Sequence, residues 1–147
     1  MRKEYQIKHK LFKNFTDIIY NNQKVGEIKR MSWYGNLNIT VNELSYTFIR
    51  KGVLNPIIEI YNTNNELLGK IKNNGWGKLT VEFENKTYLF KPINRWTGIW
   101  GLFKNEQKIN SFKNKFLKAS LIDYTNNLKL LLISLSIINS SQQVVVG

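Results

Sequence analysis

The sequence predicts a mainly β protein: a closed antiparallel barrel of about twelve strands with a buried hydrophobic C-terminal helix. Three observations predict it: strand-length runs separated by Asn- and Gly-rich turns, an internal repeat, and one C-terminal run that is apolar on every side. Before residue 122 no helical periodicity is long enough to compete with the strands. The 147 residues fit a single domain, with strands at about 4–122 and a central helix at about 125–140.

Short turns separate the expected strands. Asn21-Asn22, residues 62–65, residues 73–75 and residues 84–86 have turn composition, because Asn and Gly tolerate a positive φ. The expected strands are Tyr5–Phe12, Thr16–Tyr20, Lys24–Arg30, Leu37–Val41, Ser45–Arg50, Ile57–Tyr61, Leu67–Lys72, Lys78–Phe83, Thr87–Lys91, Gly98–Phe103, Lys108–Phe112 and Phe116–Ile122.

Part of the chain recurs at an offset of 41 to 43 residues. Residues Tyr20-Asn21, Gly26-Glu27-Ile28-Lys29, Trp33, Tyr46 and Phe48 return as Tyr61-Asn62, Gly69-Lys70-Ile71-Lys72, Trp76, Tyr88 and Phe90. A third copy that begins near Phe103 is fainter and has no tryptophan after it. Copies of about four strands that each hide one face must close on one another, and three copies are too few for most propellers. We therefore expect a barrel, with Trp33 and Trp76 as packing residues.

The C-terminal run Leu128–Ile138 is apolar all round a helical axis, which predicts a helix that is buried on all sides. Asp123 or Thr125 is expected to cap its start, and the polar residues 139–143 to end the apolar run. Eleven helical residues reach about 17 Å, short of the roughly 30 Å of a bilayer core. A membrane anchor would need a helix that continues through the polar residues to Val144–Val146. We expect instead that the helix fills the barrel.

Composition excludes several kinds of chemistry. The chain has no Cys and one His, so it offers no thiolate ligands, no disulfides and no multi-His metal site. His9 lies between two lysines and is expected to be an exposed strand residue. Glu82 and Glu84 flank Phe83, and if the strand extended to Glu84 both carboxylates would share one face. Solvated carboxylate pairs of this kind are common, and no Gly-rich phosphate loop is present. The sequence predicts a non-enzymatic protein without cofactor or metal.

The chain is strongly basic, with 22 Lys and Arg against 10 Asp and Glu and a formal charge of +12. Such a charge favours a polyanionic partner, either an anionic membrane or nucleic acid. The alternative is compositional: 18 Lys, 20 Asn and 17 Ile are the excess that an AT-rich coding sequence produces without selection for a partner. The N-terminus is charged and has no apolar signal region, so we expect a cytoplasmic protein, peripheral at the inner membrane surface if it binds lipid.

Residues 46–51 (Tyr-Thr-Phe-Ile-Arg-Lys) are followed by Pro56–Asn62, Leu68–Val81 and the hydrophobic C-terminal run. This order resembles the tubby C-terminal-like fold that tubby proteins, LURP-one-related proteins and phospholipid scramblases share. The resemblance implies that anionic phospholipid headgroups bind to basic residues on adjacent strands, here Arg50, Lys51 and Lys72. Residues 121–127 offer a single carboxylate where scramblases have an Asp-rich calcium loop, so calcium-driven scrambling is not expected.

Other interpretations stay open. Arg50, Lys51 and Lys72 can also be ordinary solvated charges, or charges that keep an edge strand from pairing. Arg95, Trp96 and Trp100 form a second candidate ligand surface, since they are less constrained by the repeat. A basic β-barrel that binds nucleic acid by stacking bases on aromatic rings is an alternative. The presence of only 4 Arg weakens the case for specific phosphate recognition by either kind of partner. A structural protein-interaction domain without a lipid ligand is another.

Overall fold

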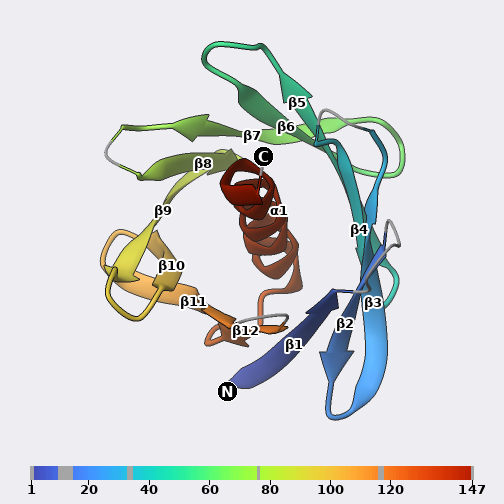
Figure 1. The fold of residues 1–147 in the computed structure, drawn as a ribbon. Helices are drawn as coiled ribbons and strands as arrows, with labels where there is room; N and C mark the ends of the chain where they lie inside the picture. The colour runs from blue at the N-terminus through green and yellow to red at the C-terminus, as the bar shows by residue number, and fades with distance from the viewer. Residues whose placement is uncertain (1, 10–14, 33–34, 76, 116–117, 147) are drawn as a thin grey trace.

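Twelve antiparallel strands close into a barrel around a single helix in the part of the chain that the structure describes (Figure 1). This computed structural model describes residues 2–9, 15–32, 35–75, 77–115 and 118–146. Each strand pairs with the strands before and after it in the sequence, and β1 pairs with β12 to close the barrel. The predicted fold class is therefore confirmed.

The elements follow one another through short connections. In chain order they are β1 (Lys3–His9), β2 (Phe15–Tyr20), β3 (Gln23–Arg30), β4 (Leu37–Val41), β5 (Leu44–Lys51), β6 (Ile57–Tyr61), β7 (Leu67–Asn73), β8 (Leu79–Phe83), β9 (Lys86–Asn94), β10 (Ile99–Lys104), β11 (Gln107–Lys115), β12 (Lys118–Asp123) and α1 (Leu128–Val146). All twelve expected strands are present within a few residues of their expected bounds. The expected extension of the first strand to Phe12 and the expected start of the last at Phe116 fall on residues outside those that are described.

The internal repeat has a structural counterpart in three β-bulges. The register shifts after Ile18 on β2, after Ile60 on β6 and after Leu102 on β10, at intervals of 42 residues. All three of these side chains are fully buried. A bulge adds one residue to one strand and increases the local twist. The faint third copy is thus a genuine repeat unit.

The N-terminal strand completes that third copy. Tyr46 on β5 and Tyr88 on β9 each pair with a buried residue of the preceding strand, and Tyr5 on β1 pairs with the buried Leu121 on β12 in the same way. All three tyrosines are buried in the core. The barrel therefore has three four-stranded units, β2–β5, β6–β9 and β10–β12 with β1, and the last is assembled from the two ends of the chain.

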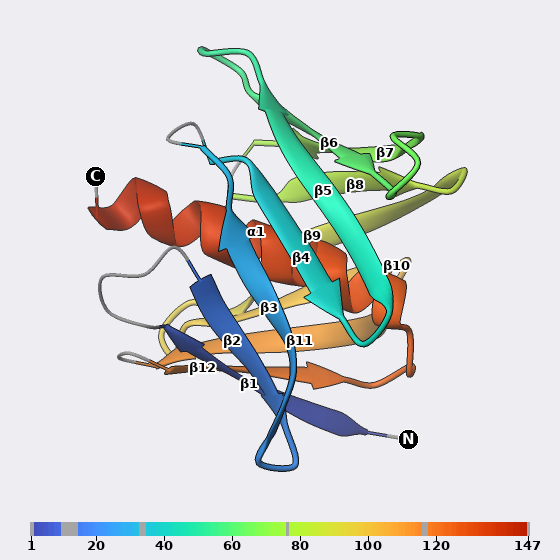
Figure 2. The ribbon, with the colours of Figure 1, turned by 90° about the vertical axis from the view of Figure 1, so that its right-hand side faces the viewer.

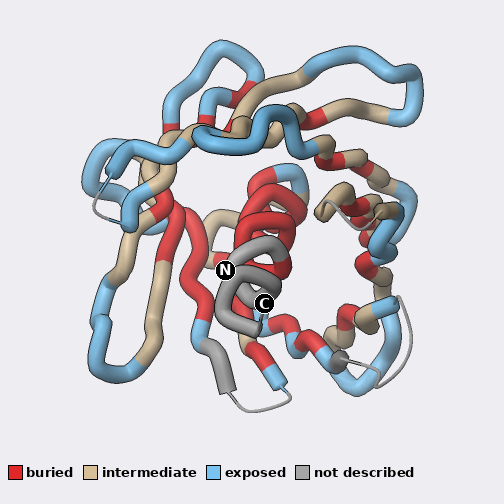
Figure 3. The backbone as a smooth tube through the Cα atoms, turned by 45° about the horizontal axis from the view of Figure 1, so that its top comes forward, coloured by how far each residue is buried: buried red, intermediate tan, exposed pale blue. Residues whose placement is uncertain are grey.

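Helix α1 passes through the barrel and ends at the side where β3 and β5 end (Figure 2). Its residues 130–139 are all buried, and Figure 3 shows this buried segment surrounded by the strands. A helix that is apolar on every side is stable only when every side is covered. The barrel supplies that cover, so the predicted central helix is confirmed.

The helix starts and ends later than expected. Asn127 Oδ1 accepts a hydrogen bond from the backbone N–H of Leu130 at 3.2 Å, which makes Asn127 the N-cap. The expectation that Asp123 or Thr125 caps the helix is wrong: Asp123 Oδ1 accepts from the Thr125 N–H within the preceding turn. Asn126, at φ 55°, redirects the chain between that turn and the helix. Residues 139–143 do not end the helix, which runs to Val146, because Ser and Gln are compatible with helix and no Gly or Pro stops it. Within the described chain, no helix combines the length and apolarity that a membrane span requires.

Candidate functional site

The two ends of the barrel differ in charge. We call the end where α1 terminates the exit end: it contains the connections that follow β3, β5, β7 and β9, whose described residues are 31–32 and 35–36, 52–56, 74–75 and 77–78, and 95–98. The opposite entry end contains the turns that follow β2, β4, β6, β8 and β10. In the sequence, the four exit-end connections contain no Asp or Glu, whereas the entry-end turns carry Glu43, Glu66, Glu84 and Glu106.

Basic side chains gather at the exit end. The described ones at or beside the strand ends there are Lys8, Lys29, Arg30, Arg50, Lys51, Lys72, Lys78, Arg95, Lys113 and Lys118. Every predicted headgroup-binding residue is in this group. The carboxylates of the turns lie at the other end, so the net positive charge of the protein is concentrated at the exit end.

Lys51 and Lys72 share a face of the sheet. Lys51 on β5 and Lys72 on β7 both pair with Ile57, which lies on the strand between them. Side chains alternate between the two faces of a strand. The buried Ile60 on β6 and Ile71 on β7 occupy the positions that face the core, and Ile57 and Lys72 occupy the alternate positions. Lys51 and Lys72 therefore lie on the outer face of the barrel. Two strand spacings separate the lysine backbones by roughly 10 Å. This is a span that one phosphorylated headgroup can bridge with long lysine side chains.

Arg50 belongs to the other face of β5. It pairs with Ile58, whose parity is that of the core residues, and it is exposed because it lies at the strand end. Its backbone N–H donates a hydrogen bond to Asn36 Oδ1 at 2.9 Å, which fastens the end of β5 to the connection between β3 and β4. The structure therefore brings Lys51 and Lys72 to one face, and places Arg50 at the same end but on the opposite side of the strand.

Each of the two outer lysines has a carboxylate neighbour. Lys72 Nζ lies 3.4 Å from Glu82 Oε1, and Lys51 Nζ lies 4.0 Å from Glu59 Oε1. Lys72 and Glu82 are both substantially exposed, and Lys51 is exposed beside a largely covered Glu59. Ion pairs with exposed partners contribute only about 0–1 kcal/mol, so a phosphate can displace the carboxylates at little cost.

The second candidate surface separates into one exposed ring and one packed ring. Trp96 is 98% exposed, and Asn94 Oδ1 accepts hydrogen bonds from the Trp96 and Thr97 N–H groups in the turn that presents it. Trp100 is half-buried and stacks on Phe90 at a centroid distance of 5.7 Å. Arg95 is exposed beside Trp96. Trp33 and Trp76 lie outside the described residues, as does the side chain of His9, whose backbone is in β1.

Barrel closure creates a basic pair that sequence reasoning missed. Lys8 on β1 stands directly opposite Lys118 on β12, and Lys113 lies on β11 close to the same end. Like charges directly opposite each other on a sheet are destabilising, and on its other side Lys8 stands opposite Asp17 of β2. No local signal in the sequence reveals the pair, because it depends on a contact between the two ends of the chain.

At the entry end, several cations are occupied by aromatic rings or carboxylates. Lys108 Nζ lies 4.6 Å from the centroid of the Tyr124 ring, and Lys129 Nζ lies 3.0 Å from Glu84 Oε1. Burial raises the pKa of Tyr124, but the hydrogen bond with Ser111 and the charges of Lys108 and Arg2 outweigh it, so that this pKa is lowered overall. Lys108 and Lys129 therefore interact with other side chains of the same protein.

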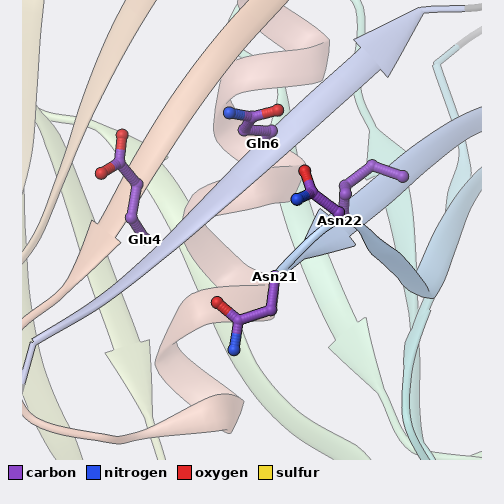
Figure 4. Close-up of a pocket in the computed structure, with 5 residues that line it drawn as sticks. Glu4, Gln6, Asn21 and Asn22 are labelled. Atoms are coloured by element: carbon purple, nitrogen blue, oxygen red, sulfur yellow. The ribbon is translucent and has the colours of Figure 1, made fainter.

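A pocket of about 250 Å³ lies between β1, β2 and the turn that follows β2 (Figure 4). It is lined by Glu4, Gln6, Ile19, Asn21 and Asn22, and none of these is a cation. A phosphate would meet the Glu4 carboxylate there without a compensating charge, so the pocket does not fit an anionic headgroup. Among the described residues, no group of three or more His, Cys, Asp or Glu is placed to hold a metal ion.

Comparison of the chain with protein-family models finds no match, and comparisons with curated proteins and with solved structures find none either.

Proposed function

We propose that this protein binds anionic phospholipid headgroups at a membrane surface and acts as a binding domain without catalytic activity. The observation that carries the proposal is the unequal charge of the two barrel ends: the exit end collects Lys and Arg in connections and strand ends, and the Glu-bearing turns are at the entry end. The barrel with its C-terminal helix is also consistent with the tubby-like resemblance, from which headgroup binding was inferred.

The physical basis is electrostatic. Each Lys or Arg near an anionic surface contributes about 1 kcal/mol to binding, and the effect falls off within a Debye length of about 8–10 Å. A charge that is spread evenly over a barrel would hold most cations beyond that distance in any orientation. A charge that is collected at one end places many of them within it at once.

Within this surface we assign the specific contacts to Arg50, Lys51 and Lys72. Lys51 and Lys72 are matched across Ile57 on the outer face, and Arg50 approaches from the other side of β5. Lysines act as point charges on a phosphate, whereas the guanidinium of Arg50 can bind two phosphate oxygens at once.

The test is co-sedimentation with vesicles of phosphatidylcholine alone, with phosphatidylserine, and with phosphoinositide, at low and physiological salt. The triple variant Arg50→Ala, Lys51→Ala, Lys72→Ala is compared with Lys86→Ala, Lys104→Ala, Lys129→Ala, which removes three charges near the entry end. Both variants lower the formal charge from +12 to +9. We expect the first to abolish binding to anionic vesicles and the second to leave it nearly unchanged.

Equal losses from the two variants would show that bulk charge alone drives binding and would contradict the assigned site. Single-stranded DNA is included as a competitor, because a basic barrel can also track phosphates of nucleic acid. Displacement of the protein from phosphoinositide vesicles by DNA at physiological salt would favour the nucleic-acid alternative over the lipid proposal.

A further inference from the structure

The exit end carries exposed apolar side chains at the tips of its connections. Leu54 and Val53 are 99% and 91% exposed in the connection after β5, Trp96 is 98% exposed after β9, and Met31 is 55% exposed after β3. We call these four residues the apolar tips. In the described chain, the other exposed large hydrophobic side chains are Phe15 and Ile93, also near the exit end, and Leu67, near the entry end.

From this arrangement we propose that the barrel docks end-on, with the apolar tips inserted into the interface of an anionic bilayer. The inference rests on the proposed lipid-binding function and adds to it an orientation and a hydrophobic contribution. In this orientation the exit end contacts the boundary between lipid headgroups and acyl chains. The surrounding Lys and Arg contact the lipid phosphates.

The topology places the tips at one end. Because neighbouring strands are antiparallel, the connections after β3, β5 and β9 all return the chain at the same rim of the barrel. Figure 2 shows the end of β3 and the β5–β6 connection on the side where α1 ends. In Figure 1 the β5–β6 connection and β9 lie on different sides of the helix. Tips that lie along one rim can all meet a plane.

The sequence next to each tip is basic. Arg30 precedes Met31, Arg50 and Lys51 precede Val53, and Arg95 precedes Trp96. Lys and Arg beside exposed apolar residues suit an anionic interface, where cations meet phosphates a few ångströms above the hydrocarbon boundary. Trp is enriched at that depth because its ring is apolar and its N–H is polar.

The entry end differs: Asn and Glu dominate its turns, while Lys24, Lys86 and Lys104 lie at the adjoining strand ends. Its turns are Asn21-Asn22, Asn42-Glu43, residues 62–66, Glu84-Asn85 and Asn105-Glu106. Glutamates at this end are repelled by an anionic surface, and Asn offers no apolar side chain to insert. Charge and apolarity therefore favour the same single orientation.

The absence of Cys from the sequence permits single-site labelling. Leu54→Cys places a probe on an apolar tip, and Asn64→Cys places a matched probe on an exposed entry-end turn. Each is labelled with an environment-sensitive fluorophore and mixed with vesicles of phosphatidylcholine and phosphatidylserine. We expect the Leu54 probe to shift to the blue and to be quenched by a lipid-chain quencher, and the Asn64 probe to do neither.

A second variant measures the hydrophobic contribution without a label. Val53→Ser, Leu54→Ser and Trp96→Ser together should weaken binding to anionic vesicles by about tenfold or more at physiological salt, where electrostatic attraction is screened. Leu67→Ser, the entry-end control, removes an exposed apolar side chain and should leave the affinity unchanged. Circular dichroism confirms that both proteins are folded, which the exposure of the changed residues leads us to expect.

The outcomes separate the two proposals. If the unlabelled protein does not sediment with anionic vesicles, the proposed function fails and the docking mode fails with it. If it sediments but the Leu54 probe stays in water, end-on insertion is overturned while headgroup binding stands. If both probes enter the lipid, the orientation is overturned. A blue shift of the Leu54 probe with single-stranded DNA as large as with vesicles would also contradict insertion into lipid.

Discussion

Ser134 on α1 donates a hydrogen bond from its Oγ to Oδ1 of Asn110 on β11, over 2.8 Å in the interior of the barrel. Both side chains are almost completely buried, at 0% and 1% exposure. Asn110 also donates from Nδ2 to the Leu130 carbonyl at 3.4 Å. The helix surface is otherwise dominated by Leu and Ile. Asn110 and Ser134 therefore link helix and strand by a polar contact inside an apolar interior.

Ser134→Ala should destabilise the fold by about 1–3 kcal/mol, because it leaves the buried Asn110 oxygen without its donor. Ser136→Ala is the matched control. The Ser136 hydroxyl is equally buried but donates to the Ile133 carbonyl of its own helix, so its removal breaks no link between helix and strand. Urea denaturation measures both. A loss from Ser136→Ala as large as that from Ser134→Ala would contradict the docking role of Ser134.

Gly26→Ala and Gly69→Ala should each destabilise the barrel to a similar extent, by about 1–3 kcal/mol or more. A Cβ at Gly69 would collide with the carbonyl oxygen of Glu82, and a Cβ at Gly26 would collide with that of Thr40 in the equivalent repeat position. Neither glycine has a positive φ, so the requirement is space between strands.

Gly75→Asn is the control for these glycine changes. Gly75 has a φ of +80°, a Cβ added there would have no neighbour within 4 Å, and Asn tolerates this backbone conformation. Thermal unfolding of the three variants should therefore show two large decreases in Tm and one small one. If only one of Gly26→Ala and Gly69→Ala were damaging, the two repeats would not be structurally equivalent.

Neutralising the carboxylates that accompany the outer lysines should strengthen membrane binding. Glu59→Gln with Glu82→Gln removes the ion-pair partners of Lys51 and Lys72 and leaves both lysines available to phosphates. We expect up to roughly thirtyfold tighter binding to anionic vesicles, because each of the two neutralised charges near the surface contributes about 1 kcal/mol.

The control for this change is Glu66→Gln with Glu106→Gln, which raises the formal charge equally but at the entry end. Vesicle titrations at physiological salt should show little gain for this pair. Equal gains for both pairs would mean that the site near Lys51 and Lys72 has no special role.

The barrel should lose stability at alkaline pH, partly through Tyr46. Burial, and then the charge of Glu84, raises the pKa of Tyr46 to about 12. The unfolded chain loses this proton near pH 10, so the stabilisation is complete below about pH 10 and is lost as the pH rises to about 12. Tyr46→Phe should flatten this alkaline decline, as measured by denaturant unfolding at successive pH values.

Tyr124→Phe should have the opposite effect. Despite burial, which raises it, the pKa of Tyr124 is lowered by Ser111, Lys108 and Arg2. The folded state therefore favours the tyrosinate, which contributes stability above the unfolded pKa of about 10. Removing it should make the alkaline decline steeper. Identical pH profiles for the Tyr46 and Tyr124 variants would show that neither local environment has the assigned effect.

Features with a local cause could be predicted from the sequence. Alternation of apolar residues predicted strands such as β4, where Leu37, Ile39 and Val41 are buried and the residues between them are partly covered. Residues 128–138 are apolar on every side of a helical axis, and this pattern predicted a helix that is buried on all sides. The cap was misplaced because Asp123, Thr125 and Asn127 are all capable caps, and only the turn at Asn126 decides among them.

The candidate site was only partly predictable. Strand alternation separates Arg50 from Lys51, but only the register that pairs both Lys51 and Lys72 with Ile57 shows which of the two shares a face with Lys72. Sequence also could not distinguish Trp96 from Trp100, since one ring is exposed and the other stacks on Phe90 through a contact between different strands.

The sequence by itself determined the strands, the central helix, the excess of positive charge and the near-threefold repeat, because these depend on side-chain pattern and composition over short distances. The tertiary structure alone decided that β1 completes the third repeat, that Lys8 faces Lys118, and that the apolar tips share one end with the basic residues. These features depend on closure of the barrel and on the antiparallel order of the strands, which brings every second connection to the same end. The barrel closes only when all twelve strands are paired, so the position of each strand end depends on the pairing of all the others.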